Sequence, residues 1–266
     1  MDKFELAEML KSAKPIDREV YISEACRGKS VLDLGCIRHS AEFALKDADW
    51  LHKKIKGTAK KVVGVDYLPE EIAKVNANGY DVVLGDVTKP LELKEKFDVI
   101  VAGDLLEHLA NMEGFFSNCK MLLKQDGALI ITTPNPFYCQ LFHYIALKKS
   151  FMVNPEHTCW VDPLCLLQLS RRFGFAVSEA AYIVKSWPMS GLMCETKKHP
   201  YDIINCRWEN EPAGFRIKRI IVEQIFGVWY FLFRHLTGAS SMLCRYSDYL
   251  AVLKKIPGDA DCRDAC

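Results

Sequence analysis

Five short apolar runs between residues 30 and 135 constrain the fold of this chain more than any other feature. We expect strands over 30–35, 61–66, 80–86, 97–103 and 127–133. Their apolar residues are consecutive, which is typical of strands buried on both faces of a sheet. Helical apolar spacing over 41–55, 69–76 and 111–123 supplies the connections. The alternation predicts an α/β fold with a doubly wound, Rossmann-like sheet.

The second half of the chain completes this sheet and carries an insertion. A helical pattern over "VDPLCLLQLSRRFGF" precedes two apolar segments, "FAVSEAAYIVKSW" and "YSDYLAVLKKI", which we expect as the final strands. The stretch 187–245 between them is longer than an ordinary connection. We expect a single domain over 1–255, with 187–245 as a substrate-side insertion or lid before the last strand, and a flexible tail over 256–266.

Composition excludes several classes of protein. The 35 Lys and Arg residues balance 34 Asp and Glu residues, so no global field attracts polyanions and nucleic acid is not favoured as a partner. The 11 cysteines show no C-x-x-C pair, and the N-terminus lacks a signal-peptide layout. The most apolar segment, 225–233, is far shorter than the roughly 20 residues of a membrane span. We expect a cytoplasmic protein with free thiols.

Three of the expected strands end in groups suited to a nucleoside. The first ends in Asp33-Leu34-Gly35-Cys36, where the glycine lets the backbone approach a ligand closely. The second ends at Asp66, where a carboxylate can accept from ribose hydroxyls, and the third at Asp86, where a carboxylate can accept from an adenine amino group. A dinucleotide oxidoreductase shares the glycine and the acid, but the chain has no G-x-G-x-x-G. Turn residues and loop acids without a ligand are the alternative.

The segments "VLDLGC", "VVGVD", "VVLGD", "FDVIVAGDLLEHL" and "LKQDGALIITTPNP" resemble, in this order and spacing, the class I S-adenosylmethionine-dependent methyltransferases. The resemblance is to the branch with "EHL" or "EHV" after the fourth strand. It implies a seven-stranded sheet with one antiparallel strand and S-adenosylmethionine as cofactor. The cofactor contacts that it implies are Asp33, Gly35, Cys36, Asp66, Tyr67, Asp86, Val87, Gly103, Asp104 and Leu105.

Within that set, the resemblance implies that Gly35 and Cys36 line the methionine part of the cofactor and that Asp66 binds its ribose. It gives Asp86 and Val87 the adenine, and places 103–105 beside the methyl donor. The chain departs from the family at Ile37-Arg38-His39, where Gly-x-Gly usually continues. We therefore expect a reshaped cofactor loop, in which Arg38, His39 or Ser40 helps to bind the methionine carboxylate or faces the substrate.

Asp104, Glu107 and His108 follow the fourth strand at spacings that share one face of a helix. Two carboxylates and an imidazole suit a divalent cation such as Mg²⁺ or Mn²⁺, which can lower the pKa of a substrate hydroxyl. Alternatively, Asp104 and Glu107 form a capping box at a helix start. A third interpretation makes Glu107, His108 or a later histidine, His157, a general base.

His157 enters through a second resemblance. Small-RNA 3′-terminal 2′-O-methyltransferases and ubiquinone-pathway O-methyltransferases are similar around these positions, and the resemblance implies a metal set of Asp104, Glu107, His108 and His157. Those families usually show Glu where this chain has Asp104, so one ligand is a methylene shorter.

The segments outside the cofactor strands are apolar and aromatic, which favours a small-molecule or glycan acceptor. We expect O-methylation of a hydroxyl on a small molecule, a sugar or a glycan or glycolipid intermediate. Methylation of an amine or carboxylate without metal, and a non-catalytic binding scaffold, are the alternatives. Phe137, Tyr138 and Trp160 lie in segments expected to overhang the substrate site, where their rings either stack on the substrate or pack in the core. Trp50 and His52 are expected in packing and surface positions.

The apolar helix pattern over 217–236 is basic at its edges. It predicts either peripheral contact with a membrane surface or a lid or homodimer helix with a buried apolar face.

Overall fold

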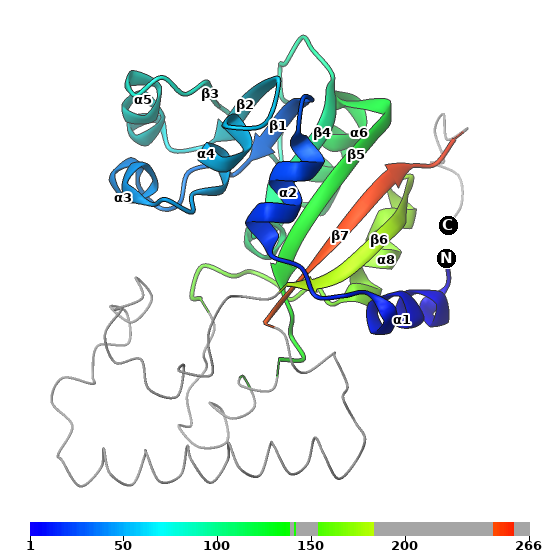
Figure 1. The fold of residues 1–266 in the computed structure, drawn as a ribbon. Helices are drawn as coiled ribbons and strands as arrows, with labels where there is room; N and C mark the ends of the chain where they lie inside the picture. The colour runs from blue at the N-terminus through cyan, green and yellow to red at the C-terminus, as the bar shows by residue number, and fades with distance from the viewer. Residues whose placement is uncertain (139–140, 142–153, 184–246, 258–266) are drawn as a thin grey trace, which may run out of the picture. The chain divides into compact units, whose positions relative to one another are not determined.

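The computed structural model describes residues 1–138, 141, 154–183 and 247–257 (Figure 1). The predicted insertion over 187–245, with its helix over 217–236, lies outside the described residues, as does the tail from 258 onward. No helix in the described part of the chain is long and apolar enough to cross a membrane.

The core is a seven-stranded sheet with the order β3-β2-β1-β4-β5-β7-β6. Its strands are β1 (Ser30–Leu34), β2 (Lys61–Asp66), β3 (Val82–Leu84), β4 (Phe97–Gly103), β5 (Leu123–Pro134), β6 (Phe175–Ile183) and β7 (Asp248–Lys255). β7 runs antiparallel to both of its neighbours, and the other pairs are parallel. The predicted seven-stranded sheet with one antiparallel strand is therefore confirmed.

The helices are α1 (Lys3–Ser12), α2 (Arg18–Cys26), α3 (Ala41–Lys46), α4 (Leu51–Lys56), α5 (Pro69–Ala77), α6 (Met112–Leu122) and α8 (Pro163–Arg172). The single helix predicted over 41–55 is wrong, because the chain breaks between α3 and α4. The Asp47 carboxylate accepts from the Asp49 backbone N–H and pairs with Arg38, so it competes with continued helix. β3 is shorter than predicted, and β5 is longer because it begins directly after α6.

Helices cover both faces of the sheet (Figure 1). Side chains of α2 and α4, including Ile22 and Ile55, pack with Val31, Val99 and Ile130 from the strands into one buried cluster. α6 and α8 lie on the other side, where Phe116 of α6 is 4.9 Å in ring-centroid distance from Phe173, just after α8. The parallel strands β1, β2 and β4 end at one edge of the sheet, where the candidate residues follow them.

Candidate functional site

The turn after β1 brings two elements of the site together at Gly35. Gly35 has a φ of +68°, and a Cβ at this position would lie 2.8 Å from the Leu105 side chain after β4. Only glycine meets both constraints without strain. The predicted cofactor residues Gly35 and Leu105 are therefore neighbours in space.

Asp66 holds the loop in which the family's glycine pair is missing. Its side chain is buried, and its two oxygens accept from the backbone N–H groups of Ile37 and Tyr67, each at 2.8 Å. Burial raises the pKa of Asp66, while these backbone donors oppose the shift. The Leu68 backbone is a third donor, so at least one of the roughly four acceptor sites of the carboxylate is left for a ribose hydroxyl. The side chain of Tyr67 is exposed beside it.

Asp86 follows β3 and lies in a short loop that α6 anchors. Its Oδ1 accepts from the Thr88 hydroxyl at 2.7 Å, and this bond lowers the pKa of Asp86. Asn118 of α6 is buried; it donates to the Val87 and Lys89 carbonyls at 2.8 and 2.7 Å and accepts from the Leu91 N–H at 3.1 Å.

Asn118 was not among the predicted site residues, although a polar residue on the apolar face of this helix was a usable signal. Its three bonds fix the loop that contains the two residues predicted to meet the adenine.

Asp33 and Cys36 lie beneath this surface. The Asp33 carboxylate is 2.8 Å from Nδ1 of His52, and both side chains are buried. The Cys36 carbonyl accepts from the Trp50 indole at 2.7 Å, and burial raises the pKa of the Cys36 thiol. The expectation of packing positions for Trp50 and His52 is confirmed, although neither lies on the surface. A cofactor role for Asp33 stays a prediction.

The chain after β4 is not the continuous helix that we expected. Asp104 has a φ of +52°, and only a single 3₁₀ turn, η1 (Leu106–His108), follows. Leu105 precedes the turn as its cap residue, and no side chain caps it. The capping box is therefore wrong, and Glu107 accepts instead from the Thr133 hydroxyl of β5 at 2.9 Å.

Arg18, at the start of α2, is a site residue that the sequence analysis did not identify. Its NH1 lies 3.2 Å from Oδ2 of Asp104, and a Cβ at Gly103 would lie 2.5 Å from its NH2. Arg18 is only 8% exposed, and its Nε is buried without a hydrogen-bond partner. A buried donor of this kind fits an anionic acceptor at the end of β4.

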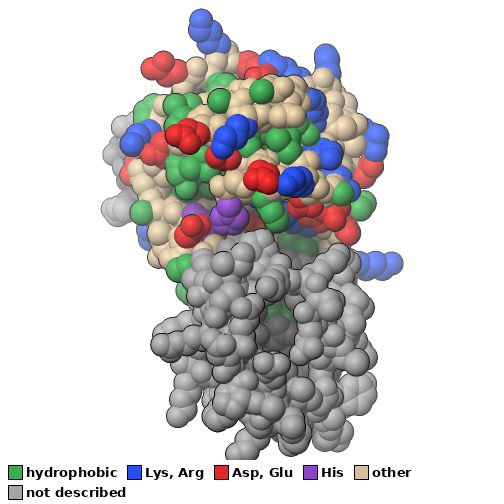
Figure 2. Space-filling view, turned by 90° about the vertical axis from the view of Figure 1, so that its left-hand side faces the viewer, with side chains coloured by type: hydrophobic (Ala, Val, Ile, Leu, Met, Phe, Trp, Pro, Cys, Tyr) green, Lys and Arg blue, Asp and Glu red, His purple; other side chains and the backbone are tan. Residues whose placement is uncertain are grey.

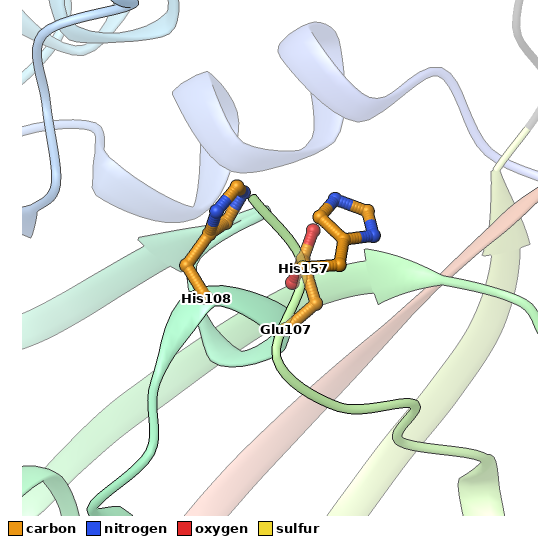
Figure 3. A group of neighbouring side chains, drawn as sticks. All are labelled: Glu107, His108 and His157. Carbon is orange, nitrogen blue, oxygen red and sulfur yellow. The ribbon is translucent and has the colours of Figure 1, made fainter. Parts of the chain in front are cut away.

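Glu107, His108 and His157 form the candidate metal site. One ligand atom from each lies within 4.8 Å of the others, and the three side chains extend toward the same side (Figure 3). The segment with His157 is fixed to the 3₁₀ turn, because the Thr158 and Cys159 backbone N–H groups donate to the Glu107 carbonyl at 2.8 and 3.3 Å. Two stretches of chain far apart in sequence therefore supply one group of donors.

The electrostatics of this group fit a cation. Burial, with the nearby charge of Asp104, raises the pKa of Glu107 to about 8. Burial and the neighbouring His108 lower the pKa of His157 to about 4, and burial lowers the pKa of His108. Nδ1 of His157 is buried without a hydrogen-bond partner. A divalent ion would stabilise the Glu107 carboxylate and accept lone pairs from both neutral imidazoles. Asp104 is not among the three grouped residues.

The surroundings of the group are partly exposed and aromatic. Trp160 is 40% exposed, and its ring lies perpendicular to the His157 ring at 6.2 Å. Phe137 is 43% exposed. His39 of the cofactor loop has Nδ1 3.9 Å from the Glu156 carboxylate. Histidine side chains reach the surface in Figure 2, with acidic side chains close to them.

Comparison with known proteins identifies the family. Residues 13–180 match the family model of the methyltransferase domain. The chain belongs to the class I S-adenosylmethionine-dependent methyltransferases. The predicted family is therefore confirmed, while the branch defined by "EHL" stays a prediction.

Two curated methyltransferases illustrate the range of relatives. A ubiquinone biosynthesis O-methyltransferase of Glaesserella parasuis is 31% identical over 132 residues, covering 44% of this chain and 52% of the relative. An (S)-coclaurine N-methyltransferase of Papaver somniferum is 32% identical over 105 residues, covering 39% of this chain and 29% of the relative. The chain thus spans about half or less of the length of these relatives.

Among solved structures, an S-adenosylmethionine-dependent methyltransferase of Clostridium acetobutylicum aligns over 92% of this chain and 94% of its own, with a TM-score of 0.50 and 9% identity. At that identity the similarity concerns the fold alone.

Proposed function

We propose that this protein transfers the methyl group of S-adenosylmethionine to a hydroxyl oxygen of a small molecule, a sugar or a glycan or glycolipid intermediate, with the help of a divalent cation. The observation that carries the proposal is the group formed by Glu107, His108 and His157 at the edge of the sheet where the cofactor residues lie. Methyl transfer to oxygen needs activation of a poor nucleophile, and this group supplies a place for it.

The predicted cofactor residues would contact each part of S-adenosylmethionine. Asp86 would accept from the adenine amino group, and Asp66 from the ribose hydroxyls. Gly35 would allow close approach of the backbone to the methionine part. The buried guanidinium of Arg18 would pair with the methionine carboxylate. When bound, S-adenosylmethionine supplies an electrophilic methyl group on a sulfonium that leaves without assistance.

The donor set also indicates which cation fits. Two imidazoles and one carboxylate suit a transition ion such as Mn²⁺ better than Mg²⁺, which prefers oxygen ligands. A bound ion acts as a Lewis acid that lowers the pKa of a coordinated hydroxyl. Trp160 would pack against the acceptor, since its exposed ring contacts the His157 side of the group.

Methylation of an amine or carboxylate remains the second candidate, because relatives with similar identity include N-methyltransferases. An amine acceptor requires no metal. In that case the neutral imidazole of His157 would accept a hydrogen bond from the amine, since its lowered pKa makes it a weak base.

Calorimetric titration of Mn²⁺, and then of Mg²⁺, into protein saturated with S-adenosylhomocysteine tests the proposal. We expect saturable Mn²⁺ binding that is lost in Glu107→Ala and in His157→Ala. Glu156→Ala is the matched control, because this neighbouring acid is exposed and outside the group. Binding that persists in the two site variants, or no binding to cofactor-loaded wild type, would contradict metal assistance and move the acceptor screen to amines and carboxylates.

A further inference from the structure

Asp104 occupies the position where the O-methyltransferase resemblance implies a fourth metal ligand, but its carboxylate is engaged elsewhere. Its Oδ1 accepts from the Thr132 hydroxyl at 2.9 Å, and its Oδ2 is 3.2 Å from the Arg18 guanidinium. These two partners lie outside the donor group formed by Glu107 and the two histidines, although the charge of Asp104 acts on all three members of that group. The carboxylate is therefore tied to α2 and β5.

The backbone at Asp104 fixes this direction. Its φ of +52° is left-handed, a conformation that Asp and Asn tolerate better than most residues. Its N–H donates to the Thr132 carbonyl at 2.9 Å, which anchors the turn to β5. The turn therefore sends the Asp104 side chain toward α2, and the next turn sends Glu107 and His108 to the donor group.

Arg18 gains a defined orientation from this contact. Burial of the guanidinium disfavours its charge, but the charge of Asp104, followed by those of Glu19, Asp248 and Asp33, outweighs that effect and raises the pKa of Arg18. Asp104 binds the NH1 corner of the planar guanidinium, while the buried Nε has no partner. The Nε edge of the fork therefore remains for an anionic acceptor.

We propose that Asp104 is a positioning residue for Arg18, which binds the methionine carboxylate of the cofactor, and that the metal has only three protein ligands: Glu107, His108 and His157. This inference rests on the proposed function. It explains why Asp replaces the usual Glu, since the shorter side chain meets Arg18 across Gly103, the residue whose missing Cβ admits the guanidinium. A three-ligand site also leaves open positions for oxygens of the acceptor.

Asp104→Asn tests the assignment, because asparagine keeps the left-handed backbone and removes the charge. We expect the affinity for S-adenosylhomocysteine to fall about 10- to 100-fold, the loss that corresponds to a misplaced charge-assisted contact. Affinity for 5′-methylthioadenosine, which has the adenosine part but no carboxylate, should stay within about threefold, well below the tenfold effect of one lost contact. Mn²⁺ affinity at saturating S-adenosylhomocysteine should stay within the same range. Arg18→Ala should reproduce the difference between the two nucleosides.

Glu107→Gln is the complementary variant. It should lose Mn²⁺ binding and keep its affinity for both S-adenosylhomocysteine and 5′-methylthioadenosine. Loss of Mn²⁺ binding in Asp104→Asn with S-adenosylhomocysteine affinity unchanged would make Asp104 a metal ligand and overturn the inference. Equal loss of both nucleosides would also overturn it, because the whole site would then be disturbed. If wild type binds no Mn²⁺, the metal proposal fails by itself, while the comparison of the two nucleosides still decides the role of Asp104.

Discussion

The two ends of the site differ in how their polar atoms are satisfied. At the nucleoside end, Asp66 and Asp86 already accept hydrogen bonds from neighbouring backbone and hydroxyl groups. At the other end, Glu107 has a strongly raised pKa and His157 has a buried nitrogen without a partner. The first arrangement is a rigid binding surface, because internal donors hold the carboxylates in place. In the second, Glu107 accepts one bond from Thr133, but the buried Nδ1 of His157 has no partner, as expected of a group that binds a cation.

Asp66→Ala should produce the largest effect at the nucleoside end. The variant removes the acceptor for the ribose and the bond that holds Ile37 of the cofactor loop. We expect S-adenosylhomocysteine affinity to fall about 100-fold, as for two lost contacts to a charged group. Isothermal calorimetry measures the affinity.

Asp98→Ala is the control for that variant. Asp98 also accepts a backbone bond, from Ser30 at 2.9 Å, but it lies at the start of β4, away from the carboxyl ends of the strands. The affinity of the Asp98→Ala variant for S-adenosylhomocysteine should equal that of the wild-type protein. A similar loss of S-adenosylhomocysteine affinity in both variants would mean that removal of any acid of the sheet disturbs the protein. Asp66 would then have no specific role in cofactor binding.

The proposed metal site should instead respond to pH. The pKa of Glu107, raised to about 8 by burial, means that the proton must leave before the carboxylate binds an ion. His157, with a pKa lowered to about 4, is already neutral at pH 6. Mn²⁺ affinity should therefore rise about tenfold per pH unit from pH 6 to 7 and level off above about pH 8, as for release of one proton.

Titration of Mn²⁺ at pH 6, 7, 8 and 9 checks this dependence. Mg²⁺, which prefers oxygen ligands, should follow the same profile at lower affinity. An affinity that does not change across this range would show that Glu107 is not the group that loses the proton.

The sheet could be predicted from the sequence because each of its parallel strands has the same local pattern. Each parallel strand has consecutive apolar residues, and the acids follow the strands directly, so Asp66 and Asp86 could be placed without coordinates. The donor group at Glu107 and His157 was available only through resemblance, because their contact depends on how the segment before Trp160 folds back.

Contacts between single polar side chains and distant elements could not be predicted from the sequence. Arg18 precedes the first strand and has no periodic signal that points to Asp104. The direction of the Asp104 side chain depends on one left-handed φ, which a spacing argument that assumes a regular helix does not predict. Asn118 was overlooked for a related reason, since its partners are carbonyl groups of a loop whose path the sequence does not reveal.

The smallest expected effect concerns His39, where the reshaped cofactor loop approaches the metal end. His39 and Glu156 are 3.9 Å apart, and their side chains are 47% and 63% exposed, so water screens the pair. We expect His39→Ala to change Mn²⁺ affinity less than about threefold, since an exposed pair contributes no more than about 1 kcal/mol. The loss in His39→Ala is compared with that in His157→Ala, in which Mn²⁺ binding should vanish. A tenfold or larger loss in His39→Ala would place the imidazole of the cofactor loop among the ligands, and the division between the two ends of the site would then be wrong.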